Sequence, residues 1–171
     1  TANTNQTEPA PENSNGRMIC PPEVFNLLDE DRKSIVKDAE TNVQKQYIVG
    51  NFFVEGIEGF PQETDLGVQY LVSAISQDCV EAAIYYCNLL IKGEFVEYSY
   101  DLAKKYLSTQ LKSKDGTIYL LYGRALRKSG EFVPAKKYFR KSAKEGNPEG
   151  MYEYGKMCYK GEGCEKDMKE A

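Results

Sequence analysis

The sequence predicts an all-α fold, a right-handed α-solenoid built from antiparallel pairs of helices. Two observations predict it. Four segments align on a small residue within a helical pattern, at spacings of 37, 36 and 32 residues, and three of these segments have a glycine six residues later, where a helix would end. A fixed period of this length, with two helices in each unit, is typical of a helical solenoid.

The aligned small residues are termed anchors, and each lies in the first helix of its unit. The anchors are Gly50, Cys87, Gly123 and Gly155. The glycines that follow them are Gly56, Gly93 and Gly161. In the third unit Ser129 takes that place and Gly130 follows. We expect the first helix of each unit to stop near these positions, because glycine adopts the left-handed conformation that ends a helix.

A second helix is predicted in the second half of each unit. A small residue recurs there, and in the first three units an aromatic residue with a bulky neighbour follows it. The small residues are Gly67, Ala103, Ala135 and Ala171. The bulky pairs are Tyr70–Leu71, Tyr106–Leu107 and Tyr138–Phe139. Small residues let two helices approach closely, and one unit cannot bury its apolar face alone, so we expect neighbouring units to stack and the aromatic rings to form core.

Composition divides the chain into three parts. Residues 1–20 are predicted to be a disordered tail or linker, because the first 16 contain no large hydrophobic residue. Residues 21–43 begin with Pro21 and Pro22 and then show helical spacing, which predicts an N-terminal helical cap. The repeats follow over 44–80, 81–115, 116–149 and 150–171, the last of them truncated, so we expect a fragment of a longer array.

The absence of histidine excludes most catalytic chemistry. It removes the commonest general base and all histidine-containing zinc sites from the 171 residues. Four acids near the first loop, Glu55, Glu58, Glu63 and Asp65, offer paired carboxylates, but their spacing equally fits solubilising loop residues. We therefore predict no enzyme, no metal site and no cofactor.

The cysteine count and the hydropathy predict a cytoplasmic protein. There are five cysteines, an odd number, and no signal peptide or membrane span is visible. A targeting segment can precede Thr1, however, since the chain does not begin with methionine. We expect free thiols, including those of Cys79 and Cys87, which are eight residues apart.

The C-terminal residues resemble a known family. Residues 150–171, GMYEYGKMCYKGEGCEKDMKEA, carry a small residue, a Leu-Gly-like pair, a Gly-x-Gly loop, an Asp and a Lys-x-Ala sequence, which is the pattern of the Sel1-like repeat, a relative of the tetratricopeptide repeat. These elements are Gly150, Tyr154–Gly155, Gly161 with Gly163, Asp167 and Lys169–Ala171. The chain is similar to Sel1-repeat proteins of trichomonad protists from about Gln44 onward.

Two features depart from the family pattern. Cys87 replaces the anchor glycine in the second repeat, and the third repeat has a short loop at residues 129–131 that is closer to a tetratricopeptide turn. The motifs are more specific in repeats three and four than in repeats one and two, and residues 141–151 closely match the junction between repeats of the family.

The resemblance implies that the first helices line a concave face that binds peptides. The residues after the anchors and their neighbours would then form a groove. The predicted groove residues are Tyr47, Asn51, Ile84, Asn88, Arg124, Arg127, Tyr152 and Lys156, with Leu120 between them. The row Asn51, Asn88, Arg124 and Lys156 resembles a clamp for a terminal carboxylate, so acidic peptides are candidate ligands, and a plain solvated groove is the alternative.

The resemblance implies a protein–protein interaction scaffold or adaptor. The alternative is a regulatory module attached to a catalytic domain, such as a protein kinase, in a longer parent protein. A basic run, Lys136, Lys137, Arg140, Lys141 and Lys144, allows phosphate binding or a solvated helix face. A pI of 5.1 argues against nucleic acid as a partner.

Overall fold

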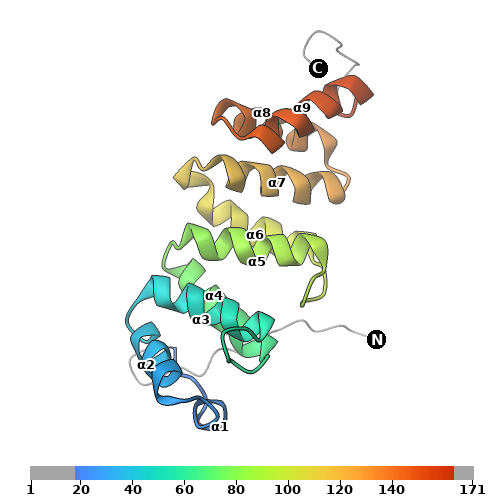
Figure 1. Ribbon diagram of the computed structural model, residues 1–171. Helices are drawn as coiled ribbons and strands as arrows, with labels where there is room; N and C mark the ends of the chain where they lie inside the picture. The colour runs from blue at the N-terminus through green and yellow to red at the C-terminus, as the bar shows by residue number, and fades with distance from the viewer. Residues whose placement is uncertain (1–17, 164–171) are drawn as a thin grey trace. The chain divides into compact units, whose positions relative to one another are not determined.

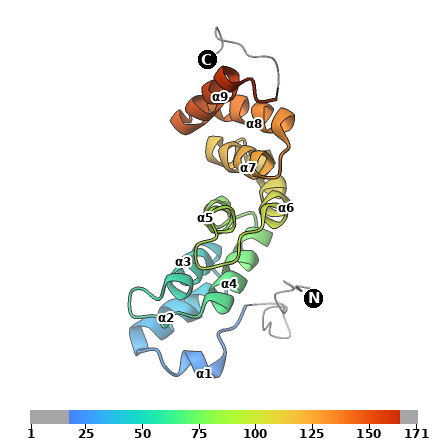
Figure 2. The same ribbon diagram turned by 90° about the vertical axis from the view of Figure 1, so that its right-hand side faces the viewer.

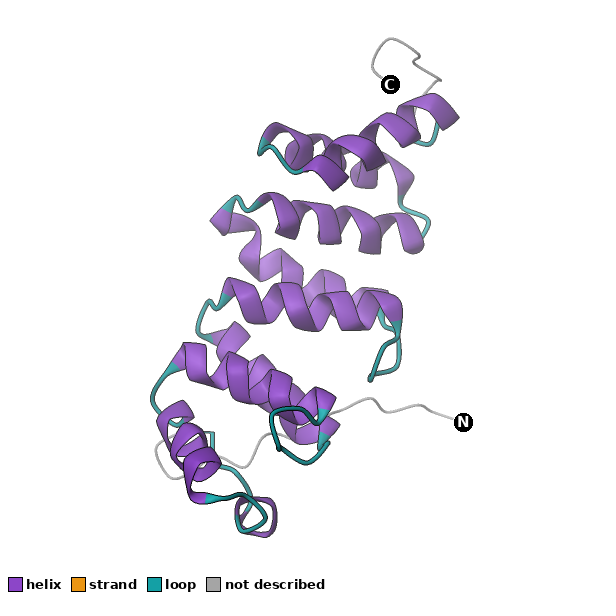
Figure 3. Ribbon diagram, in the orientation of Figure 1, coloured by secondary structure: helices purple, strands orange, loops and turns teal. Residues whose placement is uncertain are grey.

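The computed structural model describes residues 18–163, and every regular element in this range is a helix (Figure 3). The chain divides into two compact units, Thr1–Ala82 and Ala83–Ala171, with the boundary inside helix α5, Val80–Lys92. The prediction of an all-α fold made of helix pairs is therefore confirmed.

Unit 1 contains four helices, α1 to α4, within its described residues (Figure 1). They are α1 Pro22–Phe25, α2 Glu30–Ala39, α3 Val43–Glu55 and α4 Thr64–Ser76. Proline starts α1, and side chains cap the next two helices: Asp29 accepts a hydrogen bond from the Arg32 amide, and Asn42 accepts one from the Lys45 amide. The Asn42 cap fixes where α3, the first helix of the first repeat, begins.

Two glycines set the distance between α3 and α4. A Cβ atom added at Gly67 would lie 2.6 Å from the carbonyl oxygen of Gly50, and one added at Gly50 would lie 2.8 Å from Cγ of Leu71. The backbones of the two helices are thus in direct contact at this point. The predicted role of Gly50 and Gly67, close approach of two helices, is confirmed.

The core of unit 1 includes residues that precede the predicted helical cap. Met18 and Cys20 are 1% and 5% exposed and pack in a cluster that contains Val36, Phe53 and Tyr70. The predicted tail is therefore wrong for its last residues, because Met18 and Cys20 bury side chains in the core. Residues 1–17 of the predicted tail lie outside the described residues.

Unit 2 contains the rest of α5 and the later helices, with the first helices of the repeats on one side and the second helices on the other (Figure 2). They are α6 Tyr100–Gln110, the 3₁₀ turn η1 Leu111–Ser113, α7 Gly116–Lys128, α8 Phe132–Lys144 and α9 Pro148–Lys160. Asp115 caps α7 by accepting from the Thr117 and Ile118 amides, and Asn147 caps α9 by accepting from the Gly150 amide. These polar turns hold consecutive repeats in register.

Two anchors of unit 2, Cys87 and Gly123, lie where the helices of a pair meet. The Cys87 thiol donates to the carbonyl oxygen of Ala103 at 3.7 Å, and a Cβ added at Gly123 would lie 2.8 Å from the Phe139 ring. Phe139 is fully buried with Leu120 and Met157. The expected core role of the aromatic residues is thus confirmed for Phe139.

Glycines end three of the first helices as predicted, with Gly93 after α5 at φ of 75° among them. Gly56 follows α3 with φ of 67°, and Gly161 follows α9 with φ of 72°. All three are left-handed, which residues with a Cβ rarely adopt. The second helix predicted for the last repeat, with Ala171, lies outside the described residues.

Candidate functional site

Five of the predicted groove residues line one groove of unit 2, with Leu120 of α7 among them. Ile84 and Asn88 come from α5, Arg124 from α7 and Tyr152 from α9. The groove has a volume of about 680 Å³. Its lining residues are Ile84, Asn88, Lys92, Thr117, Leu120, Leu121, Arg124, Pro148, Glu149, Tyr152 and Glu153. All of them come from the first helices of repeats two, three and four.

The remaining predicted residues lie elsewhere. Tyr47 and Asn51 are half-buried on α3 of unit 1. Arg127 and Lys156 are on α7 and α9 but do not line the groove. The Lys156 ammonium lies 5.6 Å from the centre of the Tyr152 ring, so this side chain packs against a groove residue.

The floor of the groove is apolar. Leu120 and Leu121 are each 3% exposed, and Ile84 is half-buried at its edge. Tyr152 is 66% exposed at the rim. A largely buried floor with an exposed aromatic rim can bury one or two apolar side chains of a bound segment.

An ion-pair network of α7 and α9 forms one wall. Arg127 lies 2.6 Å from one oxygen of Glu153, and Arg124 lies 2.7 Å from Glu149 and 3.8 Å from the other oxygen of Glu153. Glu153 is buried, and both arginines are partly exposed. The two arginines therefore already face two carboxylates, which lowers the positive potential they offer to a ligand.

Asn88 offers the groove an amide with spare hydrogen-bonding capacity. Its side chain is half-buried, and within the described residues it forms no hydrogen bond with the protein. A side-chain amide has two donors and an acceptor, which match the backbone groups of an extended peptide. Asn88 is thus the best-placed polar group for holding a bound segment.

Sequence reasoning missed Glu149 and Glu153. A signal for them was present, because Arg124 and Arg127 are three residues apart on one first helix and Glu149 and Glu153 are four apart on the next. Residues at these spacings share a helix face, so opposite charges on neighbouring first helices indicate ion pairs across them.

The basic run of α8 is held in part by aromatic rings. The Lys141 ammonium lies 5.3 Å from the centre of the Tyr119 ring and 5.0 Å from that of Tyr138, and the Lys136 ammonium lies 5.5 Å from the Tyr154 ring. These contacts favour the solvated-face interpretation for Lys136 and Lys141, since the lysine stems cover tyrosine surface.

The described cysteines have buried thiols. Cys20, Cys79, Cys87 and Cys158 are all buried, and Cys164 lies outside the described residues. Burial raises the pKa of Cys87 to about 12, and burial with the nearby Glu23 charge raises that of Cys20 to about 12. Burial also raises the pKa of Cys79.

We expect Cys20 and Cys87 to react with iodoacetamide about 1,000-fold more slowly in the native protein than in urea at pH 8, because the thiolate is the nucleophile. Peptide-level mass spectrometry measures both rates. Native rates close to those in urea would contradict the burial.

The raised pKa of Cys87 also makes the free energy of unfolding depend on pH. The stability contributed by the buried, protonated Cys87 thiol is complete below pH 9 and is lost as the pH rises toward 12.

Two features are absent from residues 18–163, a cluster of metal ligands and a membrane-spanning helix. No group of three or more potential ligands comes together there to hold a metal ion. Among those same residues, no helix combines the length and hydropathy needed to cross a bilayer. The acids of the first loop, Glu55, Glu58, Glu63 and Asp65, lie partly or fully exposed.

Comparison with known proteins gives the family and the fold. The Sel1 repeat model matches residues 46–79, 80–109, 116–147 and 148–171. No curated protein matches the chain. A Sel1 repeat protein from Oxalobacter formigenes superposes with a TM-score of 0.60 at 18% identity, covering 74% of this chain and 98% of its own.

A second structure, a protective antigen of uropathogenic Escherichia coli with an SLR fold, superposes with a TM-score of 0.70 at 18% identity over 81% of this chain. The chain spans only 30% of that antigen's length. Both likenesses show the α-solenoid fold. Since the repeat model accounts for most of the sequence, the chain belongs to the Sel1 repeat family.

Proposed function

We propose that the chain is a non-catalytic scaffold or adaptor that binds an extended segment of a partner protein in the groove of α5, α7 and α9. Sel1 repeats are in general protein-interaction modules, which supports a role of this chain in binding other proteins. The observation that supports the groove as the binding site is the half-buried amide of Asn88, which has no hydrogen bond within residues 18–163 and lies beside the apolar floor of Leu120 and Leu121.

The mode of binding follows from these groups. The Asn88 amide bonds a backbone N–H and C=O of the segment, while one apolar side chain of the segment enters the floor and the Tyr152 ring covers it. Lys92 and Arg124 balance Glu149 and Glu153 in charge, so the groove has no net charge to repel either kind of segment.

The test is a peptide selected on the immobilised chain from a random library, with its affinity then measured by fluorescence anisotropy. We expect Asn88→Ala to weaken binding about tenfold, because two hydrogen bonds to a partly buried peptide are lost. Asn26→Ala is the matched control, since Asn26 is exposed next to α1 in unit 1. If both Asn88→Ala and Tyr152→Ala bound the peptide with the affinity of the unmodified chain, the groove would be ruled out as the binding site.

A preference for acidic segments is a separate proposal that the same assay tests. A partner carboxylate must compete with Glu149 for Arg124, because the two lie 2.7 Å apart. Glu149→Gln removes this competitor, so it should strengthen binding of a peptide with a free terminal carboxylate and leave its amidated form unchanged. An equal response of both forms would contradict a carboxylate clamp.

A further inference from the structure

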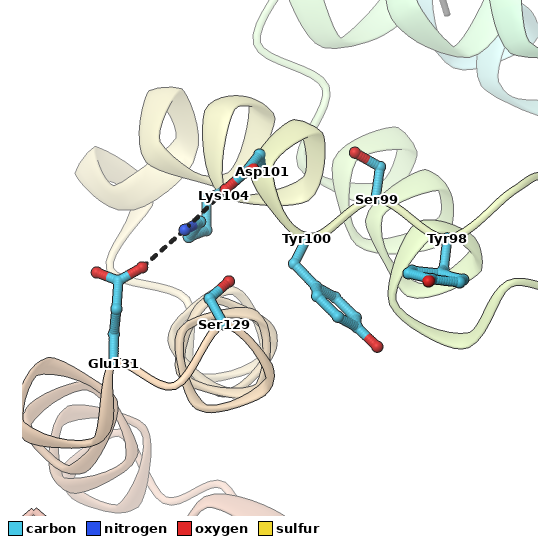
Figure 4. Close-up of a pocket in the computed structure, with 7 residues that line it drawn as sticks. All are labelled: Tyr98, Ser99, Tyr100, Asp101, Lys104, Ser129 and Glu131. Carbon is cyan, nitrogen blue, oxygen red and sulfur yellow. Dashed lines mark hydrogen bonds and ion pairs between the residues drawn. The ribbon is translucent and has the colours of Figure 1, made fainter. Parts of the chain in front are cut away.

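A second pocket lies on unit 2 (Figure 4). It has a volume of about 530 Å³ and shares no lining residue with the groove. Its lining residues are Tyr98, Ser99, Tyr100, Asp101, Lys104, Ser129 and Glu131. They come from the α5–α6 loop, the start of α6 and the α7–α8 turn.

The pocket arises where two repeats differ in loop length. The α5–α6 loop comprises residues 93–99, whereas the α7–α8 turn comprises only residues 129–131. The Ser99 amide donates to the Leu90 carbonyl at 3.0 Å, and the Glu131 amide donates to the Leu126 carbonyl at 2.9 Å, so both walls are fixed to helices. The short third-repeat loop leaves the space beside the longer one open.

One wall of the pocket is aromatic. The rings of Tyr98 and Tyr100 lie 5.5 Å apart between centres, tilted by 32°, and Tyr98 is 63% exposed. Phe95, earlier in the same loop, is 51% exposed with φ of 60°. Exposed tyrosine faces attract cations, and the exposed phenylalanine adds apolar surface in the same loop.

The other wall is acidic. Lys104 donates to one oxygen of Glu131 at 2.7 Å and lies 2.9 Å from one oxygen of Asp101, and Figure 4 shows it directed toward Glu131. Within residues 18–163 the second oxygen of each carboxylate has no other donor, so it can accept one from a ligand. Two carboxylates against one ammonium leave a net negative charge, and their hydrogen bonds raise the pKa of Lys104.

We propose that this pocket binds a lysine or arginine side chain carried by a peptide segment of a partner protein. The cation lies against the Tyr98 and Tyr100 rings and donates to the free oxygens of Asp101 and Glu131, and an apolar neighbour in the segment contacts Phe95. The site is a second contact surface and does not depend on the groove being occupied.

The test is a titration of ¹⁵N-labelled chain, followed by NMR, with the peptide acetyl-GRGRGRG-amide and with its glutamate counterpart acetyl-GEGEGEG-amide. We expect the arginine peptide alone to shift the amide resonances of residues 98–104 and 129–131, and its affinity to fall as salt is added. Equal shifts with the glutamate peptide would overturn the proposal.

Four variants locate the binding. Tyr98→Ala and Glu131→Gln should each weaken the arginine peptide about fivefold, and Tyr98→Phe should retain the affinity because the aromatic face remains. Tyr152→Ala is the matched control in the groove. If Tyr152→Ala weakened binding of the arginine peptide, or if Tyr98→Ala left it unchanged, the peptide would bind elsewhere and the proposal for this pocket would be wrong. This holds whatever ligand the groove binds.

Discussion

Gly67→Ala is expected to lower the free energy of unfolding by about 3 kcal/mol, because the added methyl group overpacks a contact between two backbones. Its Cβ would lie 2.6 Å from the Gly50 carbonyl oxygen and 2.7 Å from the Val54 amide nitrogen. Neither atom belongs to a flexible side chain, so α3 and α4 must separate. The higher helix propensity of alanine returns only about 1 kcal/mol.

Urea denaturation followed by circular dichroism measures this loss. Gly130→Ala is the matched control, because nothing lies within 4 Å of the position of its Cβ and only its φ of 82° is unfavourable. We expect that control to lose about 1 kcal/mol. If Gly67→Ala were as stable as the unmodified chain, the distance between α3 and α4 would not depend on this glycine pair.

The sequence period predicted the positions of these small residues but not how small each must be. Gly67 has Ala103 and Ala135 as its counterparts in the next repeats. In the second repeat Cys87 contacts Ala103, and in the third repeat Gly123 contacts the Phe139 ring. The combination of small and large residues at the contact between the two helices therefore differs from repeat to repeat. Periodicity fixes the register of a helix, whereas the volume at a contact depends on both partners.

The N-terminal boundary shows a second limit of the sequence pattern. Met18 and Cys20 lie in no helix, and the polar residues before them have no apolar period. Their burial against Val36 and Phe53 is a tertiary contact, which a local pattern cannot indicate. Helical spacing did predict the helical region that follows, where α1 and α2 form.

The groove was predictable as far as helix faces determine it. Ile84, Asn88, Arg124 and Tyr152 line it because the anchors fix which face of each first helix they share. Arg127 was also predicted to line the groove but does not. Its long side chain adopts a rotamer in which it lies 2.6 Å from Glu153 and 5.6 Å from the centre of the Phe139 ring, and the sequence pattern does not predict a rotamer. The Tyr98 pocket depends on two loop lengths, which the repeat alignment treats as gaps.

Arg127→Ala is expected to destabilise the protein by about 3 kcal/mol, because it leaves the Glu153 carboxylate buried with a weaker partner. The Glu153 side chain is 9% exposed, and its remaining cation, Arg124, is 3.8 Å away and paired with Glu149. Arg127 also lies over the Phe139 ring, so the truncation exposes part of that ring to water. Both effects act on the contact between α7, α8 and α9.

A double-mutant cycle separates the ion pair from this packing. The double variant Arg127→Met, Glu153→Met removes both charges and keeps the apolar volume. Its free energy of unfolding should be within about 1 kcal/mol of that of the unmodified chain, whereas Arg127→Met alone should lose more. Glu149→Ala is the matched control: its pair with Arg124 is 2.7 Å long, but its side chain is 64% exposed, so it should lose less than about 1 kcal/mol. If the losses in free energy of unfolding of Arg127→Met and Glu153→Met simply added up in the double variant, Glu153 would be solvated. The helices α7 and α9 would then be held together by the apolar floor alone.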